Sequence, residues 1–115
     1  MSKRTIHECF EVVKQAASQF DPTVAGYSLL IGCPMAEKEH RRASRQYMHV
    51  NHYEGAVCCA RAAERLRRNS LLGLFLHEFG HVLGGPKQWQ ADTAAFELFG
   101  FPIRYDARGV QFVRM

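Results

Sequence analysis

The N-terminal part of the chain carries apolar residues at helical spacing. One stripe of the predicted helix holds Ile6, Phe10, Val13, Ala17 and Phe20, and such a stripe indicates a helix that packs on a core. Thr5 followed three residues later by Glu8 matches a capping box, which predicts that the helix begins at Thr5. Asp21 and Pro22 predict its end, because proline cannot continue a helix.

Three short apolar segments follow, and each has the composition of a strand. They cover residues 27–33, 47–52 and 55–60. Tyr53, Glu54 and Gly55 form a junction that can join the second and third segments as a hairpin. We interpret the highly charged residues 37–45 as a loop or an exposed helical turn, and residues 62–68 as a short basic helical stretch.

Residues 71–83 are expected to form a buried helix, because apolar side chains cover most of its circumference. These side chains are Leu72, Phe75, Leu76, Phe79 and Leu83. The remaining stripe carries small residues and histidines, namely Ser70, Gly73, His77, His81 and Gly84. Asn69 or Ser70 can cap the start of this helix. The small residues beside the histidines leave room for a groove.

The C-terminal part adds two elements. Gly84, Gly85 and Pro86 end the buried helix sharply, and a final helix is predicted over residues 87–99. Residues 103–113 contain a turn and are expected to form a hairpin or an extended arm. The whole pattern predicts an α+β fold in a single domain over residues 1–115, with a short three-stranded sheet.

Composition indicates where in the cell this domain is expected and in which redox state its cysteines are. With 115 residues, 47% of them hydrophobic, the chain can form one core without disulfides. The longest apolar run is too short to span a bilayer, and no apolar segment of a secretory signal follows the charged start, so we expect a cytoplasmic protein without membrane contact. Reduced thiols are then expected, and because no pair has CxxC spacing, no cysteine metal site is predicted. The cysteines are Cys9, Cys33, Cys58 and Cys59.

The net charge of +4 reflects arginine clusters in residues 41–45 and 61–68. Such a basic face is either simply solvated or attracts nucleic acid or acidic peptides. The chain shows no DNA- or RNA-binding motif, so nucleic acid is not expected as a partner.

The most specific chemical feature is an HExxH motif, His77-Glu78-Phe79-Gly80-His81. Residues four apart lie one turn apart on the same helix face, so the two histidines can direct their imidazoles at one metal ion. Glu78 lies beside that position and can accept a proton from a water molecule. The combination predicts a zinc site with Glu78 as the general base of a hydrolase.

A catalytic zinc site usually has a third protein ligand. The metzincin pattern would place a histidine at position 87, where this chain has Lys87, a poor ligand because it is cationic. His49 and His52 lie on a predicted strand with a spacing that points them to opposite faces, so they are not expected to share a metal. We interpret them as polar positions of a half-buried strand.

The next predicted helix offers a carboxylate. Gln88 to Ala95 resembles the ExxAD segment of gluzincin-like peptidases, including the ImmA/IrrE-like proteins, and the resemblance covers residues 47–102. In that family pattern the glutamate is the third ligand, and the aspartate four residues later supports a ligand histidine. By resemblance, Gln88 stands at the ligand position and Asp92 at the supporting one. The resemblance implies a small zincin-like domain that uses Zn²⁺.

Gln88 changes the expected ligand set, because a neutral amide offers zinc only a carbonyl oxygen. Asp92 can take the ligand position, as an aspartate does in aspzincin-like peptidases, and charge alone favours this arrangement. Alternatively, Gln88 coordinates weakly, or the site holds little metal. Asp92 as a supporting partner of His77 is a further interpretation.

The sequence therefore predicts zinc-dependent hydrolysis of peptide bonds in a peptide or protein substrate. His77, His81 and Asp92 are the predicted zinc ligands, and Glu78 is the predicted general base. Residues 55–60 are a candidate edge strand that holds the substrate by backbone pairing. The alternative is a zincin-fold binding or regulatory protein whose metal site has degraded.

Overall fold

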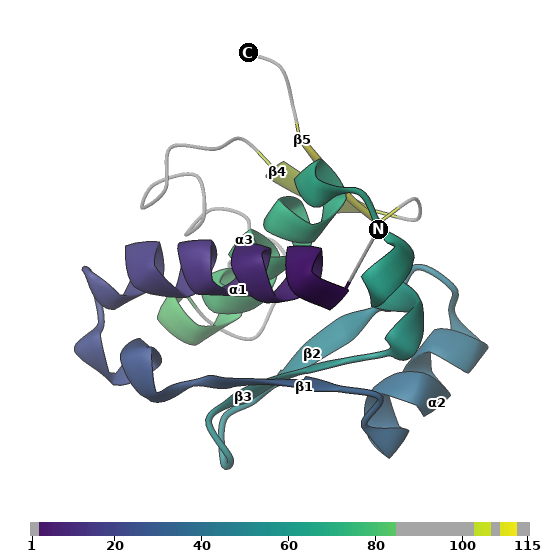
Figure 1. Ribbon diagram of the computed structural model, residues 1–115, viewed down its shortest axis with the longest axis horizontal. Helices are drawn as coiled ribbons and strands as arrows, with labels where there is room; N and C mark the ends of the chain where they lie inside the picture. Colours follow the sequence, from purple (N-terminus) through teal and green to yellow (C-terminus); the bar gives the residue numbers. More distant parts are fainter. Residues whose placement is uncertain (1–2, 85–102, 107–108, 113–115) are drawn as a thin grey trace.

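A three-stranded mixed sheet lies between helices on its two faces (Figure 1). The computed structural model describes residues 3–84, 103–106 and 109–112. Strand β3 (Ala56–Cys59) is central, parallel to β1 (Ser28–Ile31) and antiparallel to β2 (Met48–Asn51). A second, two-stranded sheet joins β4 (Ile103–Asp106) to β5 (Gly109–Phe112). The expected α+β class is confirmed.

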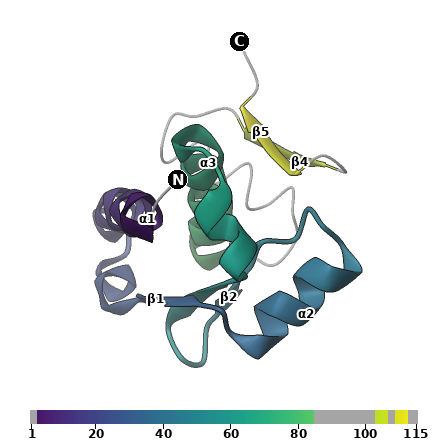
Figure 2. The ribbon, with the colours of Figure 1, turned by 45° about the vertical axis from the view of Figure 1, so that its right-hand side comes forward.

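The helices divide between the two sheet faces (Figure 2). Helices α1 (Lys3–Ser18) and α3 (Arg68–Gly84) share one core with Met48, Val57 and Cys59. Helix α2 (Pro34–Arg42) covers part of the opposite face, where Ala36 packs with Cys58. Two 3₁₀ helices, η1 (Pro22–Gly26) and η2 (Arg61–Arg65), connect these elements. All of β3 is buried because it has a strand on each side and helices on both faces.

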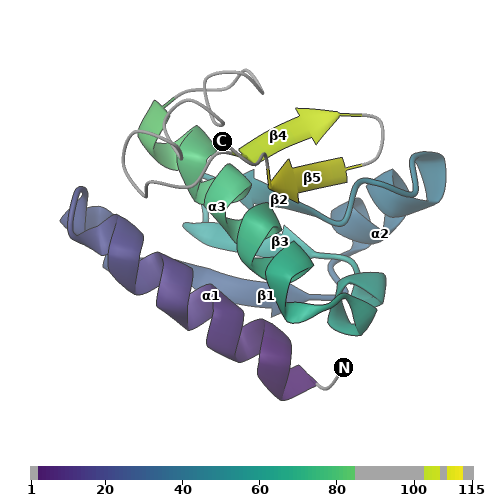
Figure 3. The same ribbon diagram turned by 90° about the horizontal axis from the view of Figure 1, so that it is seen from above.

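Aromatic rings join α1 to α3. The Phe10 ring lies 5.6 Å from that of Phe75 in an edge-on arrangement and 5.8 Å from that of Phe79. The ring of Tyr27, just before β1, lies 6.2 Å from that of Phe79. Helix α3 is buried over most of its length, as expected. Helices α1 and α3 lie side by side (Figure 3), and this packing fixes the rotation of α3 about its axis.

Most predicted elements are confirmed. The three strands form inside the predicted segments, β2 and β3 form the expected hairpin, and residues 103–112 contain a hairpin rather than an extended arm. The charged segment 37–45 belongs largely to α2, which begins with Pro34 in its first turn and ends in basic residues. The basic stretch predicted at 62–68 is mostly η2. The predicted final helix, residues 87–99, lies outside the described residues.

Three expectations about element ends are wrong. Thr5 lies inside α1 rather than capping it, and Phe20 is 53% exposed because that helix ends at Ser18. Neither Asn69 nor Ser70 caps α3, because the helix already starts at Arg68. The backbone bond from the Leu71 N–H to the Arg67 carbonyl closes its first turn.

Strand β3 is also not an edge strand. The predicted substrate-holding segment, residues 55–60, contains β3, which pairs on both sides. Strand β1, which follows η1 almost directly, pairs with β3 in parallel and so occupies the side of β3 that was expected to be open. Among the described strands of this sheet, β1 and β2 form the edges. Within the described part of the chain, no helix is long and apolar enough to cross a membrane.

Candidate metal centre

The HExxH motif lies in the C-terminal half of α3, where the helix brings its two histidines together. The Nε2 atoms of His77 and His81 are 3.1 Å apart, and their ring planes are nearly perpendicular. Zinc–nitrogen bonds of about 2.0–2.1 Å at a tetrahedral angle place two such nitrogens about 3.3 Å apart. The two imidazoles therefore fit a shared zinc ion with little movement.

Glu78 completes the local group. One ligand atom from each of His77, Glu78 and His81 lies within 4.8 Å of the others. Successive helix residues differ by about 100° in direction, so Glu78 lies to one side of the histidine pair rather than between them. That placement suits a base beside the metal better than a third ligand on it. The structure thus brings these three side chains together, and their roles as zinc ligands and general base stay predictions.

The centre is enclosed by protein. His77 is 1% exposed and Glu78 is 7% exposed, whereas His81 is half-buried. Burial, with a smaller effect from the charge of Glu39, raises the pKa of Glu78 to about 8. Burial also raises the pKa of the neighbouring Cys59 thiol well above its ordinary value, with Glu78 as the next contribution. The environment thus favours the neutral form of both groups.

Other elements pack against α3. Strand β2 and the β4–β5 hairpin both lie against the helix (Figure 3). Gly73 and Gly80 on the helix are buried, whereas Gly84 at its end is exposed. The predicted third ligand, Asp92, and the alternative, Gln88, lie outside the described residues, so their roles stay predictions.

A second group of potential metal ligands was not expected from the sequence. It comprises Cys33, His49 and Cys58, which come together on the sheet face opposite α3. The sequence contains a signal for the approach of His49 to Cys58. A hairpin centred between Tyr53 and Glu54 pairs position 49 with position 58, which is the observed register. Cysteine spacing along the chain does not reveal this group, because His49 and Cys58 meet only through the pairing of β2 with β3.

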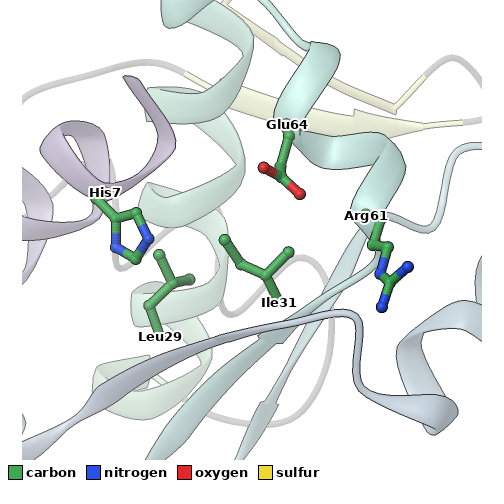
Figure 4. A pocket seen from close by; sticks show the side chains of 5 residues that line it. All are labelled: His7, Leu29, Ile31, Arg61 and Glu64. Atoms are coloured by element: carbon green, nitrogen blue, oxygen red, sulfur yellow. The ribbon is translucent and has the colours of Figure 1, made fainter. Parts of the chain in front are cut away.

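A surface pocket of about 570 Å³ lies elsewhere, at the junction of α1, β1 and η2 (Figure 4). Leu29 and Ile31 provide apolar side chains, and His7, Arg61 and Glu64 provide polar ones. No residue of the HExxH motif lines it. The pocket is therefore separate from the candidate metal centre.

Comparison with known proteins leaves the metal centre to be argued from its own geometry. No family model matches the chain, and neither a curated protein nor a solved structure matches it.

Proposed function

We propose that this chain is a small zinc-dependent metallopeptidase with a zincin-like domain, similar to the ImmA/IrrE-like proteins. The observation that carries the proposal is the 3.1 Å separation of the His77 and His81 Nε2 atoms, with Glu78 beside them on a buried helix. Asp92 is the proposed third ligand, because it is the carboxylate nearest the motif on the segment that resembles ExxAD.

The proposed roles follow from the positions of the side chains. Bound zinc would polarise the scissile carbonyl and lower the pKa of a water molecule to about 7. His77 and His81 would hold the ion, because their Nε2 atoms lie close together. Glu78, beside them, accepts a proton from the attacking water at a carboxylate oxygen and passes it to the leaving amine. Burial limits competing water at the carboxylate and so strengthens its electrostatic interactions.

The substrate is proposed to be an extended peptide that pairs with β2. This strand is an edge of the described three-stranded sheet and lies alongside α3, so a peptide added there would pass the motif. Backbone pairing at a sheet edge binds peptides through main-chain hydrogen bonds. This assignment replaces the central strand β3 as the candidate.

The test combines cleavage with metal content. Purified protein is incubated with a synthetic peptide library, and cleavage is followed by mass spectrometry. Glu78→Gln should retain the zinc of the wild type and lose cleavage by at least about 100-fold, because general-base catalysis contributes about that much or more. His81→Ala should lose cleavage and bind one zinc ion fewer per chain than the wild type.

His52→Ala is the matched control, because His52 is exposed and belongs to neither group of ligands. This variant should match the wild type in zinc content and cleavage. Full cleavage by Glu78→Gln would contradict the mechanism, and unchanged zinc in His81→Ala would contradict the site.

A binding or regulatory role without catalysis is a second candidate, favoured by Gln88 and Lys87 at positions where related patterns carry ligands. It predicts that the wild type binds zinc weakly and cleaves none of the peptides. Gln88→Glu distinguishes the two functions. A large gain in zinc affinity and in cleavage would place residue 88 at the metal and support this second candidate for the wild type. Unchanged affinity would favour Asp92 as the ligand.

A further inference from the structure

Three potential metal ligands from different elements meet on the sheet face that α2 covers. Cys33 precedes α2 as its N-cap residue, His49 lies on β2 and Cys58 lies on β3. One ligand atom from each lies within 4.8 Å of the others. Cys58 is 4% exposed, and Cys33 and His49 are half-buried. None of these residues belongs to the HExxH motif.

The backbone brings these positions together. His49 and Cys58 are directly paired in the antiparallel register of β2 and β3, so their side chains leave the same sheet face. Gly32 has a φ of +84°, and its N–H donates to the Cys59 carbonyl at 2.8 Å. This bend turns the chain out of β1 and brings Cys33 over the sheet.

The chemistry of the group suits a thiophilic ion. Two sulfurs and an imidazole nitrogen are ligands that zinc prefers in structural sites. With zinc–sulfur bonds of about 2.3 Å, a tetrahedral site places its sulfurs about 3.8 Å apart. Because the ligand atoms of the three residues already lie within 4.8 Å of one another, small side-chain rotations bring the two sulfurs to this distance.

His49 adds a second, independent indication. Its Nδ1 atom is buried and makes no hydrogen bond with any residue that the structure describes, although a Glu39 carboxylate oxygen lies 3.5 Å away. Buried polar nitrogens are rarely left unsatisfied. A cation beside the ring would satisfy this atom directly, or would fix the tautomer in which Nδ1 donates to Glu39 while the other nitrogen binds the metal.

We propose that Cys33, His49 and Cys58 form a second metal site that binds Zn²⁺, on the opposite side of the sheet from the HExxH motif. Glu39 either orients His49 or supplies the remaining ligand. The ion ties the start of α2 to the β2–β3 hairpin and so has a structural role. This site does not depend on the peptidase function proposed above.

Cobalt substitution tests the proposal, because thiolate ligands give Co²⁺ a charge-transfer absorption in the near ultraviolet that histidine and carboxylate ligands do not give. The protein is freed of metal with a chelator, kept under a phosphine reductant and titrated with Co²⁺. The wild type should develop the thiolate band. Cys33→Ser, His49→Gln and Cys58→Ser should each weaken or abolish it.

Two controls separate this site from other thiols and from the motif. Cys59→Ser changes the neighbouring cysteine, which packs in the core on the α3 side, and should retain the band. His81→Ala should also retain it, so failure of the peptidase proposal leaves this result unaffected. Zn²⁺ should raise the melting temperature of His81→Ala, and adding Cys33→Ser to that variant should abolish the increase.

Absence of the band in the wild type would overturn the proposal, and so would its persistence in both Cys33→Ser and His49→Gln. These two variants decide the matter even if Cys58→Ser fails to fold, because their side chains are only half-buried. If the proposal is overturned, Cys33, His49 and Cys58 serve only to pack α2 against the sheet.

Discussion

Glu78 places a carboxyl group inside the protein, where burial and the nearby Glu39 charge raise its pKa to about 8. At neutral pH the carboxyl group is therefore mostly protonated when no metal is bound. A cation beside it would favour the anion and lower the pKa again. A general base that is held neutral until the metal arrives would be active only in the metal-loaded protein.

This shift predicts a pH-dependent stability for the metal-free protein. The folded-state pKa lies above the ordinary value of 4.5, so the stabilising contribution is complete below about pH 4.5 and is lost as pH rises through about 8. Glu78→Gln removes the ionisation. In urea unfolding with a chelator present, the variant should exceed the wild type in free energy of unfolding at pH 8 and match it at pH 5.

Glu11→Gln serves as the control, because Glu11 is an exposed carboxylate on α1. It should not show this increase at pH 8. An equal difference between Glu78→Gln and the wild type at both pH values would show that Glu78 ionises normally in the folded protein.

Gly32 is the residue on which the position of Cys33 depends. Its φ of +84° is costly for other residues, and an added Cβ would lie 2.9 Å from the Arg61 Nε atom. Gly32→Ala should therefore lower the free energy of unfolding by about 1–3 kcal/mol in chemical denaturation. Gly26→Ala is the matched control, because a Cβ there meets no atom within 4 Å. Equal stabilities for the two variants would contradict this account.

At the scale of elements, the packing of α1 against α3 holds in place the helix that carries the HExxH motif. Phe75 is fully buried and meets Phe10 across the interface. Phe75→Ala should lower the free energy of unfolding by about 3–5 kcal/mol, because it leaves a cavity in the core. Val12→Ala, at a position of α1 that is 52% exposed, should change it by about 0.5 kcal/mol or less. Similar losses in both variants would contradict the described core.

Some of these elements could be predicted from the sequence, and others could not. His77, Glu78 and His81 were predictable as a group because helix geometry alone fixes residues three and four apart. The β2–β3 hairpin was predictable from its turn. The role of β3 was not, because the parallel partner β1 joins it through a contact that no local pattern encodes. For the same reason, the approach of Cys33 to His49 and Cys58 required the fold.

At the scale of the whole molecule, one sheet separates two candidate metal centres. The β2–β3 hairpin sends alternate side chains to its two faces. Met48 and Cys59 enter the core that holds α3, while His49 and Cys58 face α2. The adjacent residues Cys58 and Cys59 on β3 thus point to opposite faces of the sheet. On the α3 side, the imidazoles of His77 and His81 are expected to share one zinc ion.

Anomalous diffraction at the zinc absorption edge, from crystals grown with Zn²⁺, shows whether these two histidines share a zinc ion. The account predicts an anomalous peak about 2.0–2.1 Å from both the His77 and His81 Nε2 atoms, and its loss in His81→Ala. A well-diffracting zinc-soaked crystal with no peak between these two nitrogens would contradict the account, whatever peaks appear elsewhere.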